Sequence, residues 1–400
     1  MLTPLALLVV AVLFPIAFLL AELCARGCLA IRARYDVWAP HTRTLQVLDK
    51  DAFPGLPPLA RFEVNRDGER GEEPPKATWD TYRVLVIGGS AAECRFIDQR
   101  SAWPAVAHRF LGRSENLELL RSRRAHVGNL GRSLTTSRQL ALILRRVLPR
   151  YARLDAIVLM AGASDVVHWL SVRASGRIGD ESVEPDEIFD EHPEGPFGWR
   201  ARELALWRVA ASWKRGLFRP IDDHDGAGRG IARARKGRAQ AEEVIDALPD
   251  PAAMLDHFDR NFRELLRCAQ SKARTVIVVR PCWARGGIHG GSAEHGWMFA
   301  AGDLRSGENR VWYSQSVADR LLEMVERRMS AIARDCGAAE IDPKPLLHPT
   351  LEHFYDVCHL SPAGCEILGR AVAQAVLRER KGRFTSRLRA VADERHADVA

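Results

Sequence analysis

The stretch YRVLVIGGSAAEC, residues 82–94, decides the fold. Four aliphatic residues in a row, Val84 to Ile87, end at Gly88 and Gly89, and Ser90 then opens a run of helix-forming residues. A continuous apolar run bounded by glycine is typical of a strand buried on both faces, as in parallel sheets. The stretch therefore predicts a buried strand that leads directly into a helix, with a serine at the junction.

Strands and helices alternate outward from this stretch. Further strands are predicted within residues 124–131, 154–165, 273–283 and 339–345, and helices within 101–112, 137–151, 317–337 and 361–380. Alternation of this kind favours a parallel sheet that is covered by helices on both faces. The expected fold class is therefore α/β, with three layers around a central parallel sheet.

Composition divides the chain into four parts. Residues 1–25 read as a transmembrane anchor, the Pro-rich and charged residues 26–80 as an extended linker, and residues 377–400 as a basic, polar, solvated tail. Residues 81–376 form the predicted α/β domain, interrupted by an insertion over 171–270. The insertion reads as loops and linkers with helical pieces near 204–217 and 254–268, and its place above the carboxyl edge of the sheet suits either a lid or a surface excursion without a role.

The anchor prediction rests on residues 2–21, which contain no charged residue. Twenty helical residues span about 30 Å, the thickness of the hydrocarbon core of a bilayer. A cleaved signal peptide is the alternative, but no basic region precedes the apolar run and no Ala-x-Ala site follows it. Arg26, Arg32 and Arg34 follow the helix and favour a cytoplasmic domain under the positive-inside rule.

Overall charge and cysteine usage exclude little. The net charge of +7 comes from 58 basic against 51 acidic residues, which are spread along the chain, so no nucleic-acid partner is expected. The eight cysteines lack the even, short spacing of a disulfide scaffold. Free cysteines fit a reducing compartment, but buried free cysteines are common, so the cysteines do not establish the compartment.

Ser90 has several possible roles. The stretch lacks the G-x-G-x-x-G pattern of dinucleotide sites and the Lys-Ser/Thr pair of phosphate loops. It also lacks the second glycine of a G-x-S-x-G elbow, because Ala92 stands there. A nucleophile at a helix N-terminus and a simple helix cap remain open on this stretch alone.

Asp356 and His359 stand three residues apart in FYDVCHLSPAG, just before the last predicted helix. On a turn, this spacing lets the carboxylate orient the imidazole while the other ring nitrogen faces a nucleophile. A lone D-x-x-H pattern is weak evidence for a catalytic pair. It becomes stronger here because the pattern lies at the end of the same predicted α/β domain that begins with the serine stretch.

Four blocks in this order, GGSAAEC, VGNLGRSLTTSRQ, VLMAGASD and DVCHLSPAG, resemble those of the SGNH/GDSL hydrolases. The resemblance covers roughly residues 82–165 and 340–376 and implies a flavodoxin-like three-layer sandwich. By position it implies Ser90 as the nucleophile, His359 as the general base and Asp356 as the group that orients His359. It also implies an extracytoplasmic domain, which the arginines after the anchor oppose, so the side of the membrane stays open.

The implied oxyanion hole departs from the family pattern. By resemblance it would consist of Ser90, Gly131, Leu134 and Ser164, of which Leu134 stands where a glycine is usual and Ser164 where an asparagine is usual. A hydroxyl still donates one hydrogen bond, but with shorter reach, and loss of one oxyanion donor costs about 3 kcal/mol. A leucine is restricted if φ must be positive at this position.

Other candidates surround this set. Asp165, Arg280 and Trp283 are candidate substrate-binding residues, and Trp297 could also shape an acyl or sugar pocket. His289 and His295 lie in a glycine-rich loop without a matching carboxylate, so no metal and no cofactor is expected.

The expected function is hydrolysis of O-acyl esters, most simply O-acetyl esters, on a carbohydrate or lipid-like substrate through an acyl-serine. Two alternatives remain. One is an acyltransferase that uses the same serine and excludes water with the insertion. The other is a catalytically weak scaffold protein of polysaccharide assembly, suggested by Leu134 and Ser164.

Overall fold

The computed structural model describes most of the chain, in the ranges 4–32, 34–50, 52–53, 55–76, 78–174, 183–194, 197–218, 221–224, 226–303 and 309–397. Parts of the predicted anchor (1–3), insertion (175–182, 195–196, 219–220 and 225) and tail (398–400) lie outside the described residues.

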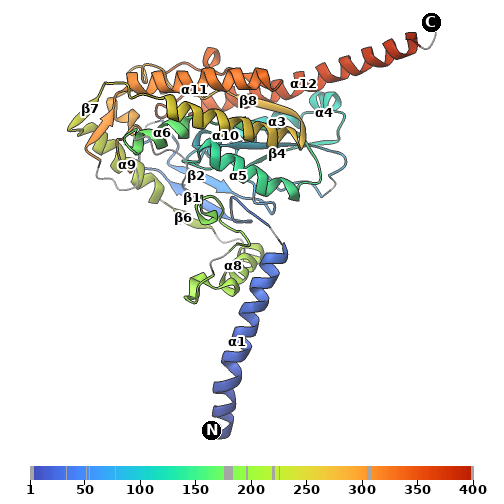
Figure 1. Cartoon of the computed structure of the whole chain (residues 1–400), viewed down its shortest axis with the longest axis vertical. Helices are drawn as coiled ribbons and strands as arrows, with labels where there is room; N and C mark the ends of the chain where they lie inside the picture. The colour runs from blue at the N-terminus through green and yellow to red at the C-terminus, as the bar shows by residue number, and fades with distance from the viewer. Residues whose placement is uncertain are drawn as a thin grey trace.

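A five-stranded parallel sheet forms the centre of the molecule (Figure 1). Its strands are β3 (Thr81–Gly88), β4 (Arg124–Asn129), β5 (Leu154–Met160), β8 (Ala273–Val279) and β10 (Ala339–Ile341). Their spatial order is β10-β8-β5-β3-β4, and every neighbouring pair is parallel. Renumbered within the sheet this is the order 2-1-3-4-5 of flavodoxin-like folds, so the predicted fold class is confirmed.

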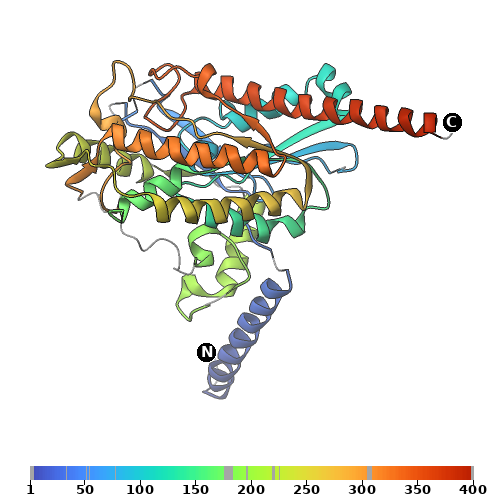
Figure 2. The same ribbon diagram turned by 45° about the horizontal axis from the view of Figure 1, so that its top comes forward.

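Helices cover both faces of the sheet because alternate side chains of each strand point to opposite faces. Leu85 and Ile87 of β3 pack into one hydrophobic core, and Val84 and Val86 pack into the other. The first core is closed by α5 (Ser137–Val147), α6 (Ala163–Ser171), α10 (Ala252–Gln270) and α11 (Gln315–Asp335). The second is closed by α3 (Trp103–Leu111), α4 (Ser114–Leu120) and α12 (Pro362–Ala397), as Figure 2 shows from a second side.

The remaining elements lie around this sandwich. They are α1 (Pro4–Arg32), α2 (Ser90–Glu93), α7 (Pro185–Ile188), α8 (Ala205–Phe218), α9 (Gly226–Ala239), and the short strands β1 (Arg43–Val47), β2 (Leu59–Glu63), β6 (Asp222–His224), β7 (Glu243–Ile245) and β9 (Val311–Tyr313). Single 3₁₀ turns occur at Leu148–Arg150, Ala201–Glu203, Ala293–Gly296 and Lys344–Leu346. The short strands form two small sheets, β2-β1-β6 and β7-β9.

The predicted linker over 26–80 is part of the folded domain. Val37, Phe62 and Val64 are buried in the core that also contains Leu85 and Ile87 of the central sheet. The prediction of a linker was wrong because the Pro-rich, charged composition of this segment is atypical of strands. Its two short strands are stabilised by long-range pairing, since β1 pairs with β2 and with β6.

The insertion is also more ordered than predicted. Its last helix, α10, is a covering helix of the sheet that packs against α5 and α11. The segment 222–240, expected to be a linker, contains α9, whose Ala234 and Arg235 are buried. Its four glycines disfavour a helix, so packing against the domain, and not intrinsic propensity, holds it. The predicted polar tail continues α12 as a helix to Ala397.

One helix in the described part of the chain, α1, is long and apolar enough to cross a membrane by length and composition. Over Ala11–Arg32 its mean hydropathy is 1.9 and its side chains are largely exposed. It projects away from the sandwich, at the lower end of the molecule in Figure 1. A membrane anchor and a signal sequence both meet this description.

A buried carboxylate ties residues 65–70 to the sheet. Glu69 is fully buried and accepts hydrogen bonds from Tyr151 Oη (2.7 Å) and Arg83 Nη2 (3.0 Å), and it contacts His126 Nε2 at 2.9 Å. Burial alone would raise the pKa of Glu69, but the hydrogen bond and charge of His126 and the charge of Arg83 outweigh it and lower the pKa well below its ordinary value.

We expect Glu69→Gln to lower the free energy of unfolding by about 3 kcal/mol at neutral pH, because the buried cations lose their countercharge. A depressed folded-state pKa contributes stability that is complete above the ordinary value of 4.5 and is lost as the pH falls below it. The difference in the free energy of unfolding between wild type and Glu69→Gln should therefore become smaller as the pH falls below 4.5. Urea unfolding in mild detergent measures both effects.

The matched control is Glu63→Gln, which removes a partly exposed ion pair with Arg43. It should change the free energy of unfolding by less than about 1 kcal/mol. Equal effects of the two substitutions would show that residues 65–70 are not part of the folded domain.

Candidate active site

Ser90 lies at the carboxyl end of β3, the strand at which the order of strands in the sheet reverses. The strands β4 and β5 that follow β3 lie on opposite sides of it, so the crossovers diverge and leave a crevice at this end. Gly88 permits the tight turn, because a Cβ atom there would lie 2.7 Å from both Ala92 Cβ and Met160 O. Ser90 then begins the one-turn helix α2.

His359 meets Ser90 across the crevice. Its Nε2 atom lies 2.7 Å from Ser90 Oγ, and its Nδ1 atom lies 2.8 Å from each carboxylate oxygen of Asp356. The ring of Tyr355 stacks parallel to the imidazole, with centroids 5.5 Å apart. The three predicted catalytic residues thus form a continuous hydrogen-bonded chain from the carboxylate to the hydroxyl.

Asp356 is buried and held from several sides. Its Oδ1 atom accepts the backbone N–H groups of Cys358 (3.0 Å) and His359 (2.9 Å), and its Oδ2 atom accepts the indole N–H of Trp297 (3.2 Å). Burial alone would lower the pKa of His359, but the charge and hydrogen bond of Asp356 outweigh burial, so that pKa is raised above its ordinary value of 6.5. The carboxylate therefore both orients the ring and favours its protonated form.

A buried arginine fixes the end of the helix that carries Ser90. Arg70 donates from Nη1 to the carbonyls of Glu93 and Cys94 (2.7 Å to Cys94 O) and from Nη2 to that of Ile97 (2.7 Å). Glu93 and Cys94 lie at the C-terminus of this helix, where a cation suits the negative end of the helix dipole. Sequence reasoning missed Arg70 because it placed this residue in a linker.

The four predicted oxyanion residues have different surroundings. Ser90, Leu134 and Ser164 line the cavity in front of the nucleophile. Gly131 does not line it, and its N–H donates instead to Asn129 Oδ1 (2.8 Å). A side chain at Gly131 would overlap the backbone of Ala92 and Glu93, so this glycine allows β4 and α2 to approach each other. Its predicted role as a donor is replaced by a role in packing.

Leu134 and Ser164 take positions that suit the roles implied for them. Leu134 has φ of 60°, the left-handed conformation that glycine adopts freely and that costs a leucine about 1 kcal/mol. Ser164 lies in the first turn of α6, and a Cβ atom at Gly89 would be 2.8 Å from its Oγ atom. The hydroxyl therefore lies beside the backbone that presents Ser90.

Asp165, by contrast, does not reach the cavity. It is buried, and it accepts hydrogen bonds from the backbone N–H (3.1 Å) and the hydroxyl (2.6 Å) of Ser137 at the start of α5. Burial raises the pKa of Asp165 to about 6. Its role is to join α6 to α5, because an acceptor at a helix N-terminus satisfies free N–H groups.

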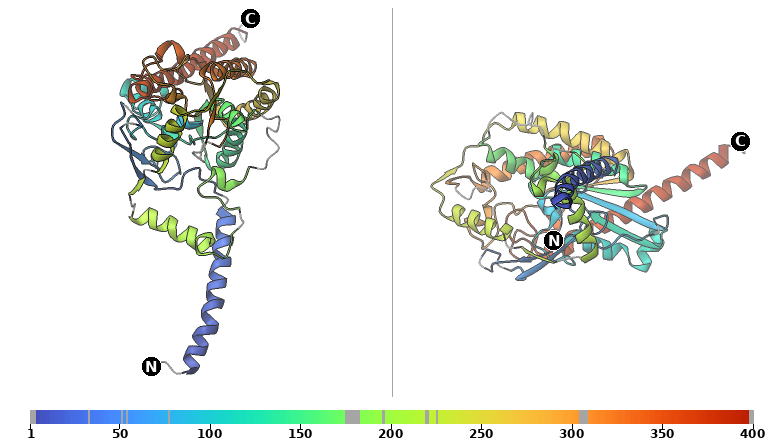
Figure 3. Two further views of the ribbon diagram at one scale, coloured as in Figure 1. Left: turned by 90° about the vertical axis from the view of Figure 1, so that its left-hand side faces the viewer. Right: turned by 90° about the horizontal axis from the view of Figure 1, so that it is seen from below.

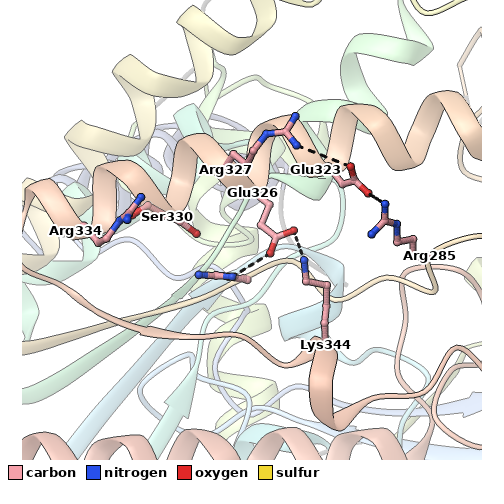
Figure 4. A pocket seen from close by; sticks show the side chains of 8 residues that line it. Arg285, Glu323, Glu326, Arg327, Ser330, Arg334 and Lys344 are labelled. Atoms are coloured by element: carbon pink, nitrogen blue, oxygen red, sulfur yellow. Dashed lines mark hydrogen bonds and ion pairs between the residues drawn. The ribbon is translucent and has the colours of Figure 1, made fainter.

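Arg280 and Trp283 lie elsewhere too. Arg280 pairs with Glu340 (2.8 Å) and Asp342 (3.0 Å) and lines a different, shallow cavity of about 470 Å³. Figure 4 shows that Glu323 of this cavity pairs with Arg285 and Arg327, and that Glu326 pairs with Lys344. Trp283 is buried and donates to Asp319 Oδ1 (3.0 Å). Neither lines the cavity of Ser90, which corrects their prediction as substrate-binding residues.

The cavity at Ser90 has a volume of about 370 Å³ and draws its wall from distant parts of the chain. Apolar side chains form most of it, namely Phe96, Leu134, Val167, Ile231, Trp297 and Met298. Arg95 and Arg233 add positive charge. Ile231 and Arg233 belong to α9, which the sequence did not predict as a helix, whereas Trp297 was considered there as a pocket residue. In the part of the chain that the structure describes, no cluster of side chains suits a metal ion.

Comparison with known proteins gives matches only among solved structures. No family model matches the chain, and no curated protein matches it. The chain is similar to the acetylxylan esterase Axe2 from Geobacillus stearothermophilus, with 15% identity, a TM-score of 0.38 and coverage of 74% of this chain and 94% of that one. It is also similar to LAE5, an alpha/beta hydrolase enzyme from the metagenome of Lake Arreo, Spain, with 14% identity, a TM-score of 0.36 and the same coverage.

Likenesses at this identity and TM-score say nothing about catalysis in this chain.

The raised pKa of His359 can be tested directly. A pH titration followed by NMR of the imidazole carbon-bound protons should give a pKa above 6.5 in the wild-type chain. In Asp356→Asn the pKa should fall, because the opposing charge is lost while burial remains. The His359→Gln variant identifies the signal. A wild-type pKa at or below 6.5 would contradict the proposed pairing of the two groups.

Proposed function

We propose that the chain is a serine ester hydrolase of SGNH/GDSL type that cleaves O-acyl esters through an acyl-Ser90 intermediate. The observation that carries the proposal is the hydrogen-bonded chain from Asp356 through His359 to Ser90 Oγ, with 2.7 Å between the imidazole and the hydroxyl. A scaffold protein would not need this geometry. The cavity in front of the hydroxyl, of about 370 Å³ and lined largely by apolar side chains, leaves room for an ester substrate.

The reaction would follow from the positions of these groups. Ser90 Oγ attacks the ester carbonyl carbon while His359 Nε2 takes the hydroxyl proton, and the carbonyl oxygen becomes an oxyanion. The protonated imidazole, stabilised by Asp356, then gives the proton to the leaving alcohol as its C–O bond breaks. In the second half a water molecule attacks the acyl-serine, its proton passes to Nε2 and on to Ser90 Oγ, and the carboxylic acid leaves.

The oxyanion would be stabilised near Ser164 and the backbone of Ser90. Both line the cavity, and the Ser164 hydroxyl lies against Gly89 next to the nucleophile. A hydroxyl in this place supplies one donor where the resembled family uses a carboxamide. Transfer of the acyl group to a sugar hydroxyl in place of water would use the same intermediate.

We also propose that α1 is an uncleaved membrane anchor. Over Ala11–Arg32 its apolar side chains are largely exposed, which suits contact with lipid. An O-acetyl ester on a cell-envelope carbohydrate or a lipid-like ester would then be the substrate class within reach. That the domain is extracytoplasmic stays a prediction.

Substitution of the nucleophile tests the reaction. The wild-type chain should hydrolyse p-nitrophenyl acetate faster than the butyrate ester, and Ser90→Ala should lower kcat by about 10⁴-fold or more, because no other group can form the acyl intermediate. Ser114→Ala, on an exposed helix start, should leave kcat unchanged. The hydrolase proposal fails if Ser90→Ala equals wild type and a fluorophosphonate does not label Ser90.

The role of Ser164 is tested by removal of its hydroxyl. Ser164→Ala should lower kcat by about 100-fold with little change in KM, because an oxyanion donor acts mainly in the transition state. Ser171→Ala on the same helix is the control, since its hydroxyl only bonds the carbonyl of His168. Full activity in Ser164→Ala would assign the oxyanion hole to backbone N–H groups alone.

A further inference from the structure

The helix α8, in the middle of the insertion, exposes large apolar side chains on one face. Trp213, Leu217 and Phe218 are 66%, 76% and 75% exposed, and Trp207 is 53% exposed. Trp199 and Ile221 extend the same apolar character to either side of the helix. Single exposed apolar residues are common, but several on one short helix mark an interaction surface.

The amphipathic pattern of α8 is inverted relative to a surface helix of a soluble protein. Arg208 and Arg215 point toward the domain, where Arg208 pairs with Asp186 (3.3 Å) and Arg215 with Glu191. At about 100° per residue, Leu206, Trp213 and Leu217 lie on the opposite side of the helix from these arginines. The polar face is thus used for attachment to the domain, and the apolar side chains stay exposed, although Trp213 and Leu217 also line a groove with Arg32, Arg34 and Arg66.

The start of α8 is fastened to α1. The Glu22 carboxylate of α1 is buried and accepts the backbone N–H groups of Ala205 (2.9 Å) and Leu206 (3.0 Å). These are N–H groups of the first turn of α8, which have no partner within the helix, and the negative charge also suits the positive end of the helix dipole. Arg26, one turn further along α1, pairs with Glu22 and donates to the carbonyl of Gly198 (3.2 Å).

The position of Glu22 sets the depth of α8. Residues 2–21 contain no charge, so the apolar span of α1 ends one residue before the carboxylate that holds α8. A helix fastened at this point lies where hydrocarbon gives way to headgroups. Figure 3 shows α8 running across the axis of α1 between the domain and the N-terminal part of α1. A helix that crosses a membrane-spanning helix at its end lies along the membrane surface.

We propose that α8 is an interfacial helix, whose outward face of Trp207, Trp213, Leu217 and Phe218 is embedded in the headgroup and acyl boundary of the bilayer that α1 crosses. The proposal rests on α1 being an uncleaved anchor, and it adds a second membrane contact contributed by the insertion. Tryptophan is favoured at this depth, and Lys214, which lies between Leu217 and Trp207 on the same face, can extend its amine to the headgroups.

Continuity with α1 favours the bilayer over other occupants of this face. A second copy of the chain or another protein would also bury the apolar side chains. Neither would account for the attachment of α8 at the charge that ends the apolar span, whereas an apolar helix at that depth can bury its side chains at the lipid boundary.

Photo-crosslinking in the full-length chain tests the proposal. A benzophenone amino acid is placed at residue 213 or 217, or at the control position Trp79, which is equally exposed on the domain but distant in sequence from both membrane-facing helices. The protein is reconstituted in vesicles of phosphatidylethanolamine and phosphatidylglycerol, irradiated and analysed by mass spectrometry. We expect about tenfold more lipid adduct at 213 and 217 than at 79, because burial of these side chains in lipid is favourable.

Two further measurements distinguish a failure of the interfacial helix from a failure of the anchor or of the proposed hydrolase activity. The intact mass shows whether residues 1–25 are retained, and hydrolysis of p-nitrophenyl acetate by each sample reports on the proposed function independently of lipid contact. Equal lipid adducts at all three positions, or adducts at 213 and 217 only to protein, would overturn the proposal. A loss of fluorescence quenching by brominated lipid in Trp213→Phe, compared with the buried control Trp283→Phe, would support it without a crosslinker.

Discussion

The hydrogen bond between Ser90 Oγ and His359 Nε2 joins two parts of the chain that are 269 residues apart in sequence. The serine comes from the end of the first strand of the central sheet, and the histidine from the turn before the last helix. Neighbouring residues in sequence cannot bring these two side chains together, so the rest of the domain must position both Ser90 and His359. Much of the structure around them contributes to this positioning.

On the serine side, the constraint is the exit of β3 into a helix of a single turn. Gly88 and Gly131 allow the backbones of β4, β5 and α2 to approach closely, and Arg70 binds the carbonyls at the far end of the helix. On the histidine side, Asp356 accepts the N–H groups of its own turn and that of Trp297. Both partners are thus held by buried polar groups, which are costly to leave unpaired and so define one geometry.

The two departures from the resembled family pattern, Leu134 and Ser164, line the same cavity. Ser164 stands where an asparagine is usual, and it lies against Gly89, the residue before the nucleophile. A side chain at 89 would meet the hydroxyl at 164, so a change at one position is coupled to the other. Two helices of the insertion also take part in these arrangements. The helix α9 forms part of the cavity wall, and α8 is hydrogen-bonded to α1. The insertion connects the proposed reaction centre with the proposed membrane contact.

The sequence by itself predicted the five strands and their parallel arrangement, because apolar runs and strand-to-helix junctions are local patterns of consecutive residues. The three-residue spacing of Asp356 and His359 is also local, whereas their pairing with Ser90 was predicted from the resemblance of four sequence blocks to a known family. Only the tertiary structure decided that residues 34–76 belong to the domain, that α9 lines the cavity and that Asp165, Arg280 and Trp283 do not. Those outcomes depend on long-range burial: Arg70 and Glu69 look like ordinary surface charges in sequence, and only the packing of β3 and β4 against them makes them buried. For the same reason the inward polar face of α8 could be recognised only once Asp186 and Glu191 were seen beneath it.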